Sequence, residues 1–298
     1  MSKPSVNIGP TGVWYGGLDL LPAAQAIETA QRIEEMGYGA LWIAEGLGRE
    51  PFAWAGSLLS ATKSMPVATG IASIYARGAM TMVAGQRTLA EAFPGRFLLG
   101  LGVSHEIVVE GVRGLDYSRP YSDMVAYLDR MDAVPYRSQA PATDPGRVLA
   151  ALGPRMLRLS AEKANGAHPY FVSPDHTVEA RAAIGADALL APEQMVVLES
   201  DPHVARRIAR SYMAMYLERP NYLNNLRRLG FAEEEWSNGG SDRVVDAIVA
   251  WGDEDAIATR VRQHRDAGAD HVCIQVCLPD PRTSAVPVLE RLAPALLP

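Results

Sequence analysis

Residues 66–105 read PVATGIASIYARGAMTMVAGQRTLAEAFPGRFLLGLGVSH, and this stretch decides the fold. It contains two apolar runs, VATGIASIY and RFLLGLGV, in which apolar and polar residues do not alternate. Between them lies a helical pattern that ends at Pro94 and Gly95. Strands without alternation are buried on both faces, so the stretch predicts two parallel strands joined by a helix. Small and polar residues follow each run, at the strand ends where parallel α/β folds bind their ligands.

Similar runs recur along the whole chain and alternate with helical patterns. The predicted strands are residues 6–9, 40–45, 67–74, 96–103, 147–152, 166–172, 194–199 and 271–277. The predicted helices are residues 22–36, 52–62, 79–92, 120–131, 154–164, 175–185, 253–267 and 286–296. Strands and helices that alternate in this way over 298 residues predict an α/β fold, a (β/α)8 TIM barrel.

The longest excursion from this alternation lies between the seventh and eighth predicted strands. Residues 201–252 hold two or three further helical patterns, including SDPHVARRIARSYMAMYL and SDRVVDAIVAW. No linker, low-complexity segment or further repeat interrupts the chain. We therefore expect residues 1–298 to form a single domain, with a helical insertion at 201–252.

Composition restricts the partners and the compartment. The net charge is −6 and no basic run occurs, so nothing favours binding to nucleic acid or to an anionic membrane. Apolar runs are interrupted well before the roughly 18 residues of a membrane span, and the N-terminus lacks a signal-like apolar region. Cys273 and Cys277, four residues apart on one predicted strand, would lie about 13 Å apart, too far for a disulfide. Free thiols indicate a reduced, cytoplasmic protein.

Two loops and one carboxylate are candidates for a site at the predicted strand ends. One loop begins a helix and consists of Leu152, Gly153, Pro154 and Arg155. The N-terminal N–H groups of this helix suit a phosphate, although the loop could equally be an ordinary strand-to-helix turn.

The second loop is GVSH, which ends in Ser104 and His105 after the fourth predicted strand. His105 could exchange protons or orient a ligand, or it could be structural. Glu45, after the second predicted strand, is the third candidate. The alternative for Glu45 is a solvated carboxylate or one paired with Arg49.

Metal-dependent and serine hydrolysis fit the sequence less well. His105 and His168 both fall near predicted strand ends, but the first predicted strand, Val-Asn-Ile-Gly, offers no metal ligand. His168 sits inside a strand, followed by Pro169 and Tyr170, which favours a packed or cofactor-facing side chain. No G-x-S-x-G elbow is present. We expect no metal.

Several segments together resemble the bacterial luciferase-like monooxygenase superfamily, and more narrowly its actinobacterial branch that uses the deazaflavin coenzyme F420. The segments are ALWIAEGLGREPF, TGIASIYAR, GRFLLGLGVSH, VLAALGPRMLRLSAEKANGAHPYFVSPDHT and DAGADHVCIQV. The resemblance implies a (β/α)8 barrel with an insertion, a flavin or deazaflavin across the strand ends, and a homodimer.

The resemblance also implies positions for the cofactor. A non-prolyl cis peptide in a bulge of the third strand supports the central ring in this family, and the matching bond here is Ala72–Ser73. The ring is expected near Ala72, Ser73, Val103 and Ser104. The phosphate and tail are expected near Leu152, Gly153, Pro154 and Arg155.

Two positions depart from the deazaflavin dehydrogenases of the family. Those relatives carry Asp-His after the second strand, where this chain has Glu45-Gly46, and they carry Glu at the position of His105. A sugar-phosphate dehydrogenase is therefore disfavoured, while redox chemistry on another substrate stays open. His105 is the first candidate for proton donor or substrate orienter, and Glu45 is the second.

The sequence thus predicts a cytoplasmic oxidoreductase that moves a hydride between reduced coenzyme F420 and a small organic substrate. One alternative keeps the fold and uses FMN and molecular oxygen, as a monooxygenase. Another is a catalytically inactive barrel that only binds a cofactor or partner, and a metal-dependent hydrolase is the least favoured. The substrate pocket is expected between the loops after the first, fourth and seventh strands and the insertion.

Overall fold

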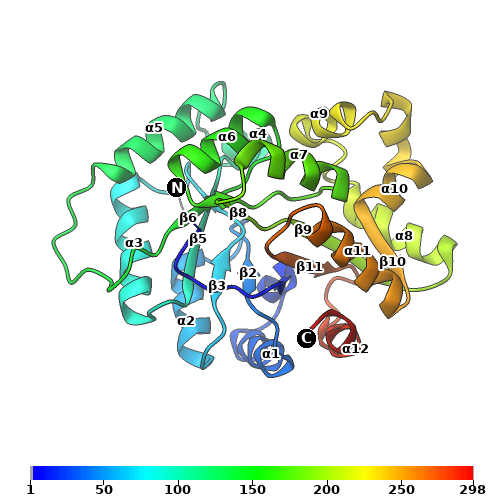
Figure 1. Cartoon of the computed structure of the whole chain (residues 1–298), viewed down its shortest axis with the longest axis horizontal. Coiled ribbons are helices and arrows are strands. Elements are labelled where there is room, and N and C mark those ends of the chain that lie inside the picture. The colour runs from blue at the N-terminus through cyan, green and yellow to red at the C-terminus, as the bar shows by residue number, and fades with distance from the viewer. Residues whose placement is uncertain (1–2, 298) are drawn as a thin grey trace.

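Parallel strands form a curled sheet at the centre of the molecule, and helices lie around it (Figure 1). The computed structural model describes residues 3–297. The strands are β1 (Thr11–Trp14), β2 (Leu41–Ile43), β3 (Val67–Thr69), β4 (Ala72–Ser73), β5 (Phe97–Gly102), β6 (Arg147–Leu149), β7 (Gly166–Ala167), β8 (Leu189–Leu190), β9 (Glu193–Leu198), β10 (Val249–Gly252) and β11 (Val272–Val276). Their order is β10-β9-β11-β1-β2-β3-β5-β6-β7-β8, with β4 beside β5.

One short segment links β8, at one edge of this sheet, to β9, which lies next to the other edge strand. β8 and β9 both belong to residues 189–198, yet β8 pairs with β7 while β9 pairs with β11 and β10. The strand pairings among the described residues are all parallel, and β5 is buried along its whole length. The sheet therefore curls into a TIM-like barrel, as strands buried on both faces predict.

The helices are α1 (Ala23–Met36), α2 (Pro51–Ala61), α3 (Ala79–Ala92), α4 (Glu106–Val109), α5 (Pro120–Asp132), α6 (Pro154–Lys163), α7 (Pro174–Ile184), α8 (Pro202–Met213), α9 (Pro220–Arg228), α10 (Asp242–Ile248), α11 (Glu254–Asp266) and α12 (Val286–Leu296). Two 3-10 helices, η1 (Gly16–Leu20) and η2 (Glu233–Gly239), complete the set. Several helices begin with proline, which presets the first helical φ and lacks the N–H that would be unpaired there. The helices predicted at 79–92 and 286–296 have these bounds in the structure.

The first strand was predicted too early in the chain. Residues 6–9 precede the sheet, and β1 begins at Thr11. Gly9 has a φ of +64°, and Pro10 has no N–H for a ladder, so the extended chain cannot continue through them. Val6 and Ile8 are nevertheless buried, in a cluster with Trp42 and Ala40 inside the barrel. Val6 and Ile8 are therefore apolar because they pack in the core, and not because they belong to a strand.

The third predicted strand, residues 67–74, is split by a bulge. Ala68 pairs with Leu98 and Ala72 pairs with Leu101, so between these two pairs the β3–β4 segment contains one more residue than β5, which defines a bulge. The hydroxyl of Thr69 donates to the Gly100 carbonyl at 2.7 Å and accepts from the Gly100 N–H at 2.8 Å, in place of backbone groups. This side chain fills the interruption of the ladder.

Residues 201–252 contain α8, α9, η2 and α10, which gather at one side of the molecule, and then β10 (Figure 1). The prediction of helix through SDRVVDAIVAW was wrong at its end, because α10 stops at Ile248 and Val249–Gly252 pairs with β9. The β-branched and aromatic residues of this short segment suit a strand. That this segment is an insertion between a seventh and an eighth barrel strand stays a prediction.

Two further observations concern the whole fold. Cys273 and Cys277 are free and buried, as the spacing predicted. None of the helices within residues 3–297 has both the length and the apolar character needed to cross a membrane.

Candidate functional site

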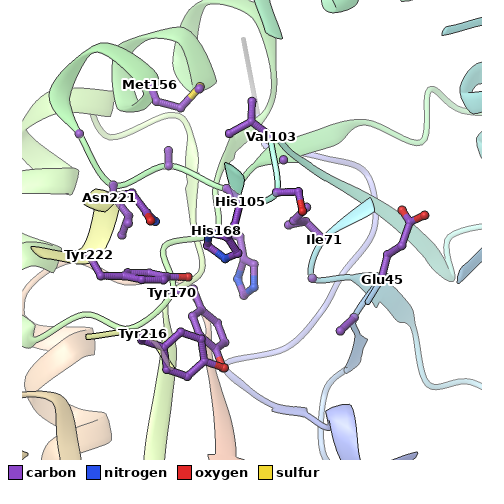
Figure 2. A pocket seen from close by; sticks show the side chains of 18 of the residues that line it. Glu45, Ile71, Val103, His105, Met156, His168, Tyr170, Tyr216, Asn221 and Tyr222 are labelled. Atoms are coloured by element: carbon purple, nitrogen blue, oxygen red, sulfur yellow. The ribbon is translucent and has the colours of Figure 1, made fainter. Parts of the chain in front are cut away.

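A cavity of about 410 Å³ opens at the carboxyl ends of the strands (Figure 2). Its volume lies in the range of pockets for small organic ligands. Segments far apart in the sequence supply its lining, which consists of Trp14, Ala44, Glu45, Gly70, Ile71, Gly102–His105, Ala150–Gly153, Met156, His168, Tyr170, Met215, Tyr216, Asn221 and Tyr222. The strand ends are where the parallel fold predicts a site.

The bulge of the third strand forms part of this lining, with its cis peptide between Gly70 and Ile71. The prediction of a cis bond at Ala72–Ser73 was wrong, because these two residues form β4 and pair in register with Leu101 and Gly102. Both are buried and lie outside the cavity lining. The carbonyl of Gly70 accepts a hydrogen bond from the indole of Trp14 at 3.0 Å, which fixes its direction.

Val103, Ser104 and His105 follow β5 and line the cavity. Ser104 has a φ of +57°, in the left-handed region that non-glycine residues rarely adopt, and Tyr117 donates to its carbonyl at 3.0 Å. This conformation turns the chain away from the strand direction and places His105 at the N-cap of α4.

His105 is half-buried, with its ring centroid 5.6 Å from that of Tyr222. Burial lowers the pKa of His105, the positive charge of Arg219 lowers it further, and a hydrogen bond with Asn221 opposes both. The imidazole is therefore neutral at pH 7, and its hydrogen bond with Asn221 leaves one ring nitrogen for a ligand.

Glu45 also lines the cavity, but other groups of the protein occupy both of its oxygens. Arg77 donates to Oε1 at 2.6 Å and to Oε2 at 2.9 Å, and the N–H of Ser73 donates to Oε2 at 2.7 Å. Arg113 lies 3.8 Å from Oε1. The suggested pairing with Arg49 was wrong, because Arg49 donates to the carbonyls of η1 and its surroundings and lies over Trp54. Glu45 therefore ties β2 to the bulge.

His168 presents a lone pair without a partner. Its Nδ1 lies 2.7 Å from the Ala191 carbonyl, so Nδ1 carries the hydrogen and Nε2 is an acceptor that no group within residues 3–297 satisfies. The ring stacks on Trp42 at 4.2 Å, and Trp42 donates to His271 at 3.0 Å. Burial lowers the pKa of His168 to about 4, which keeps the ring neutral. Its sequence context indicated a packed or cofactor-facing side chain, and it is buried at the edge of the cavity.

The loop before α6 is divided between the cavity and the surface. Leu152 and Gly153 line the cavity, whereas Pro154 and Arg155 lie outside its lining, and Arg155 covers the ring of Tyr121 at 4.1 Å. Arg228 of α9 takes the place expected for Arg155. It donates to the Leu152 carbonyl at 3.1 Å, and its Nη1 would lie 3.6 Å from a Cβ at Gly153.

The structure thus brings together Glu45, Val103, Ser104, His105, Leu152 and Gly153 of the predicted residues. Sequence reasoning missed Trp14 and Tyr170, and it expected the insertion at the pocket without identifying Met215, Tyr216, Asn221 or Tyr222. A spacing signal was present, because Tyr222, Asn225 and Leu226 follow the i, i+3, i+4 pattern and are buried in α9. Such a pattern indicates packing and does not reveal that the packed face borders a ligand cavity. Within residues 3–297 there is no group of three His, Cys, Asp or Glu side chains placed to hold a metal ion.

Comparison with known proteins places this geometry in a family. Residues 8–271 match the model of the luciferase-like monooxygenase family. A Mycobacterium tuberculosis protein, whose name provisionally calls it a coenzyme F420-dependent oxidoreductase, is 25% identical over 86% of this chain and 92% of its own length.

Solved structures with the same fold include enzymes of two kinds. An F420-dependent secondary alcohol dehydrogenase, in complex with an F420-acetone adduct, has a TM-score of 0.77 and 15% identity, over 97% of this chain and 99% of that one. The oxygenating constituent of 3,6-diketocamphane monooxygenase of Pseudomonas putida, in complex with FMN, has a TM-score of 0.70 and 15% identity, over 97% and 99%.

Proposed function

The chain belongs to the luciferase-like monooxygenase family, and from this premise we propose that it is an oxidoreductase that transfers a hydride between reduced coenzyme F420 and a small organic substrate. The name of the M. tuberculosis relative supports the choice of cofactor. The observation that carries the proposal is the cavity at the strand ends, lined by backbone and small side chains on one side and by tyrosines on the other (Figure 2).

The barrel side of the cavity fits a flat ring. Its small residues are Ala44, Gly70, Gly102, Ala150, Ala151 and Gly153. A Cβ on Gly102 would lie 2.5 Å from Ile71 and one on Gly70 would lie 2.7 Å from Trp14, so only glycine permits this close packing. The resulting surface carries few protruding side chains, which lets a planar tricyclic ring approach the backbone.

The cofactor phosphate fits at the N-terminus of α6. Gly153 is the N-cap and Pro154 opens the helix, so the following N–H groups have no partner within the helix. Arg228 adds a guanidinium beside Gly153, and a phosphate would gain both the helix N-terminus and this charge.

In this assignment the cofactor would supply the hydride and the chain would supply position, and the balancing proton would come from solvent, passed on by the protonated minor form of His105. Tyr222 would offer its O–H and His105 its remaining ring nitrogen to the substrate oxygen, and Asn221 would orient both through its interactions with them. Glu45, held by Arg77, would keep the bulge in place and would not itself exchange protons. Residues 201–252 would form the insertion that covers the substrate side.

One observation favours FMN as a second candidate: a neighbour of the same fold holds FMN and is named as a monooxygenase constituent. The phosphate position described above would serve either cofactor. The two candidates differ in chemistry, because a deazaflavin favours hydride transfer whereas a reduced flavin also reacts with oxygen.

The test is a fluorescence titration of the purified protein with coenzyme F420 and with FMN, followed by oxygen-electrode measurements with each reduced cofactor. The proposal expects tighter binding of F420 and no substrate-dependent oxygen uptake. Tighter binding of FMN together with oxygen uptake would replace it by the monooxygenase candidate. Binding of neither would refute both.

A further inference from the structure

One wall of the cavity is built from aromatic rings of three separate segments. Tyr170 follows β7, Tyr216 follows α8 and Tyr222 lies in α9, and we call these three residues the tyrosine wall. The centroids of Tyr170 and Tyr216 lie 5.3 Å apart and those of Tyr216 and Tyr222 lie 5.4 Å apart. Phe171 packs behind Tyr216 and Tyr222 at 5.1 and 5.2 Å, and Trp14 extends the wall from Tyr170 at 5.2 Å.

The hydroxyl groups of two of these tyrosines are already used. Tyr170 donates to Gln275 at 2.7 Å, so its oxygen accepts from Tyr216, whose hydroxyl lies 2.7 Å away. Neither hydroxyl has a hydrogen left for a ligand, and what Tyr170 and Tyr216 present to the cavity is ring surface. These bonds also fix the orientation of the rings, which reduces the entropy cost of stacking against them.

The polar groups gather at one end of the wall. Figure 2 shows the hydroxyl of Tyr222 directed into the cavity, on the side where His105 and His168 lie. Asn221 interacts with both His105 and Tyr222. Burial raises the pKa of Tyr222 well above its ordinary value, so this hydroxyl keeps its hydrogen and acts as a donor.

The lining contains no free charge. Glu45 is its one acidic residue within the described chain, and Arg77 pairs with it, while no Lys or Arg belongs to the lining residues. Arg228 lies beside Gly153 and Arg219 acts on His105, but neither is a lining residue, so a charged substrate on the tyrosine wall would lose its hydration without a counter-charge in contact, which is costly.

We propose that the substrate is an uncharged, planar aromatic compound whose ring stacks on the tyrosine wall and whose single carbonyl or hydroxyl oxygen meets Tyr222 and His105. This inference rests on the proposed function for its site and deepens it by naming the substrate class. An apolar ring fits the surfaces of Tyr170 and Tyr216, and one polar oxygen fits the O–H of Tyr222 and the remaining ring nitrogen of His105 at the end of the wall. Each aromatic pair adds a preference beyond the burial of its area.

The experiment measures binding of three matched probes by ligand-observed NMR titration, without cofactor and at saturating cofactor. Acetophenone is planar, aromatic and neutral; cyclohexyl methyl ketone has the same carbonyl on a saturated ring; 4-acetylbenzoate adds a charge. We expect acetophenone to bind about tenfold more tightly than either of the others. Equal affinities of acetophenone and the saturated ketone, or tightest binding of the charged probe, would overturn the proposal.

Two variants locate the effect. Tyr216→Leu and Tyr222→Leu remove a ring but keep an apolar side chain, and each should reduce the preference for acetophenone to about threefold or less. Tyr136→Leu is the matched control, because Tyr136 packs against Arg87 outside the cavity lining and should leave the preference intact. A preference that persists in both wall variants contradicts the assignment, and the comparison of probes on the wild-type protein decides the matter even if one variant does not fold. Because the probes are also titrated without cofactor, their relative affinities test the substrate class even if the protein does not bind F420.

Discussion

Replacing Glu45 by glutamine should cost the protein about 3 kcal/mol of its free energy of unfolding. The carboxylate and Arg77 form a buried pair, with side-chain exposures of 7% and 10%. Removal of one partner from such a pair typically costs about 3–5 kcal/mol, because the other charge stays buried without compensation. We expect the lower end of that range, since Arg77 keeps a contact of 3.1 Å with the more exposed Glu50.

This cost converts into a measurable shift of melting temperature. The unfolding entropy is about 2.1 cal/mol/K per residue, or roughly 0.63 kcal/mol/K for a chain of 298 residues. A loss of about 3 kcal/mol then lowers the Tm by about 5 °C. The assay is thermal unfolding followed by circular dichroism, with Glu290→Gln as the control. Glu290 also pairs with an arginine, Arg32, but both side chains are about half exposed, so its variant should shift the Tm by less than about 2 °C.

Turnover of Glu45→Gln separates a structural role from a catalytic one. If Glu45 ties β2 to the bulge, turnover at a temperature well below the Tm should fall less than in His105→Ala. An unchanged Tm combined with a loss of turnover of a hundredfold or more would refute the reasoning and make Glu45 a proton carrier.

The remaining predictions concern three other features. His105→Ala should lower turnover by about 100- to 10,000-fold with little change in cofactor affinity, whereas replacement of the exposed His203 by alanine should change neither turnover nor affinity. A loss of cofactor binding without a loss of turnover would mean that His105 is a cofactor contact. Arg228→Ala should weaken FMN or F420 binding about tenfold in a fluorescence titration, whereas Arg155→Ala, which removes a contact with Tyr121, should leave binding unchanged. A larger loss of binding in Arg155→Ala than in Arg228→Ala would mean that Arg155 is the phosphate partner. Burial lowers the pKa of four histidines, to about 4 for His168, His176 and His271 and about 3 for His264. The contribution of these neutral histidines to the free energy of unfolding is complete above their unfolded pKa near 6.5 and is lost as the pH falls towards 4. Burial raises the pKa of Glu193 to about 8, so the contribution of this single group increases as the pH falls. The urea midpoint should therefore drop between pH 6.5 and pH 5, and a constant or rising midpoint would show that these histidines are not buried as neutral rings.

The sequence predicted helices better than strands, for a physical reason. Helix ends carry local signals, such as Pro154 at the start of α6 and the left-handed Gly37 at the end of α1. Strands in a parallel barrel have no such signals, because burial on both faces makes them resemble any apolar segment. The apolar pattern therefore predicts a strand at Val6 and Ile8, which only pack in the core, and a helix at Val249–Gly252, which pairs with β9.

The candidate site was predictable where it follows strands and unpredictable where it depends on tertiary contact. Ser104 and His105 directly follow β5, so their place at the cavity could be read from the chain. Tyr216 and Tyr222 reach the same cavity from α8–α9, and Arg228 reaches the Leu152 carbonyl beside it. No local pattern states which strand end a distant helix will cover. The cis peptide was misplaced by two residues because the pairing of Ala72 and Ser73 with β5 is a property of the register, which the sequence does not display.

The division of the cavity between barrel and α8–α9 has a consequence for engineering. The positions that we propose to contact a flat cofactor come from strand ends, where a Cβ on Gly70 or Gly102 would crowd Trp14 or Ile71. The lining residues Met215, Tyr216, Asn221 and Tyr222 come from one short stretch of the chain. A library that randomises only these four positions would explore new substrates while the cofactor surface stays unaltered. Recombination of residues 201–252 between relatives would exchange the proposed substrate wall on a larger scale, provided that Arg228, the proposed phosphate partner in α9, is kept.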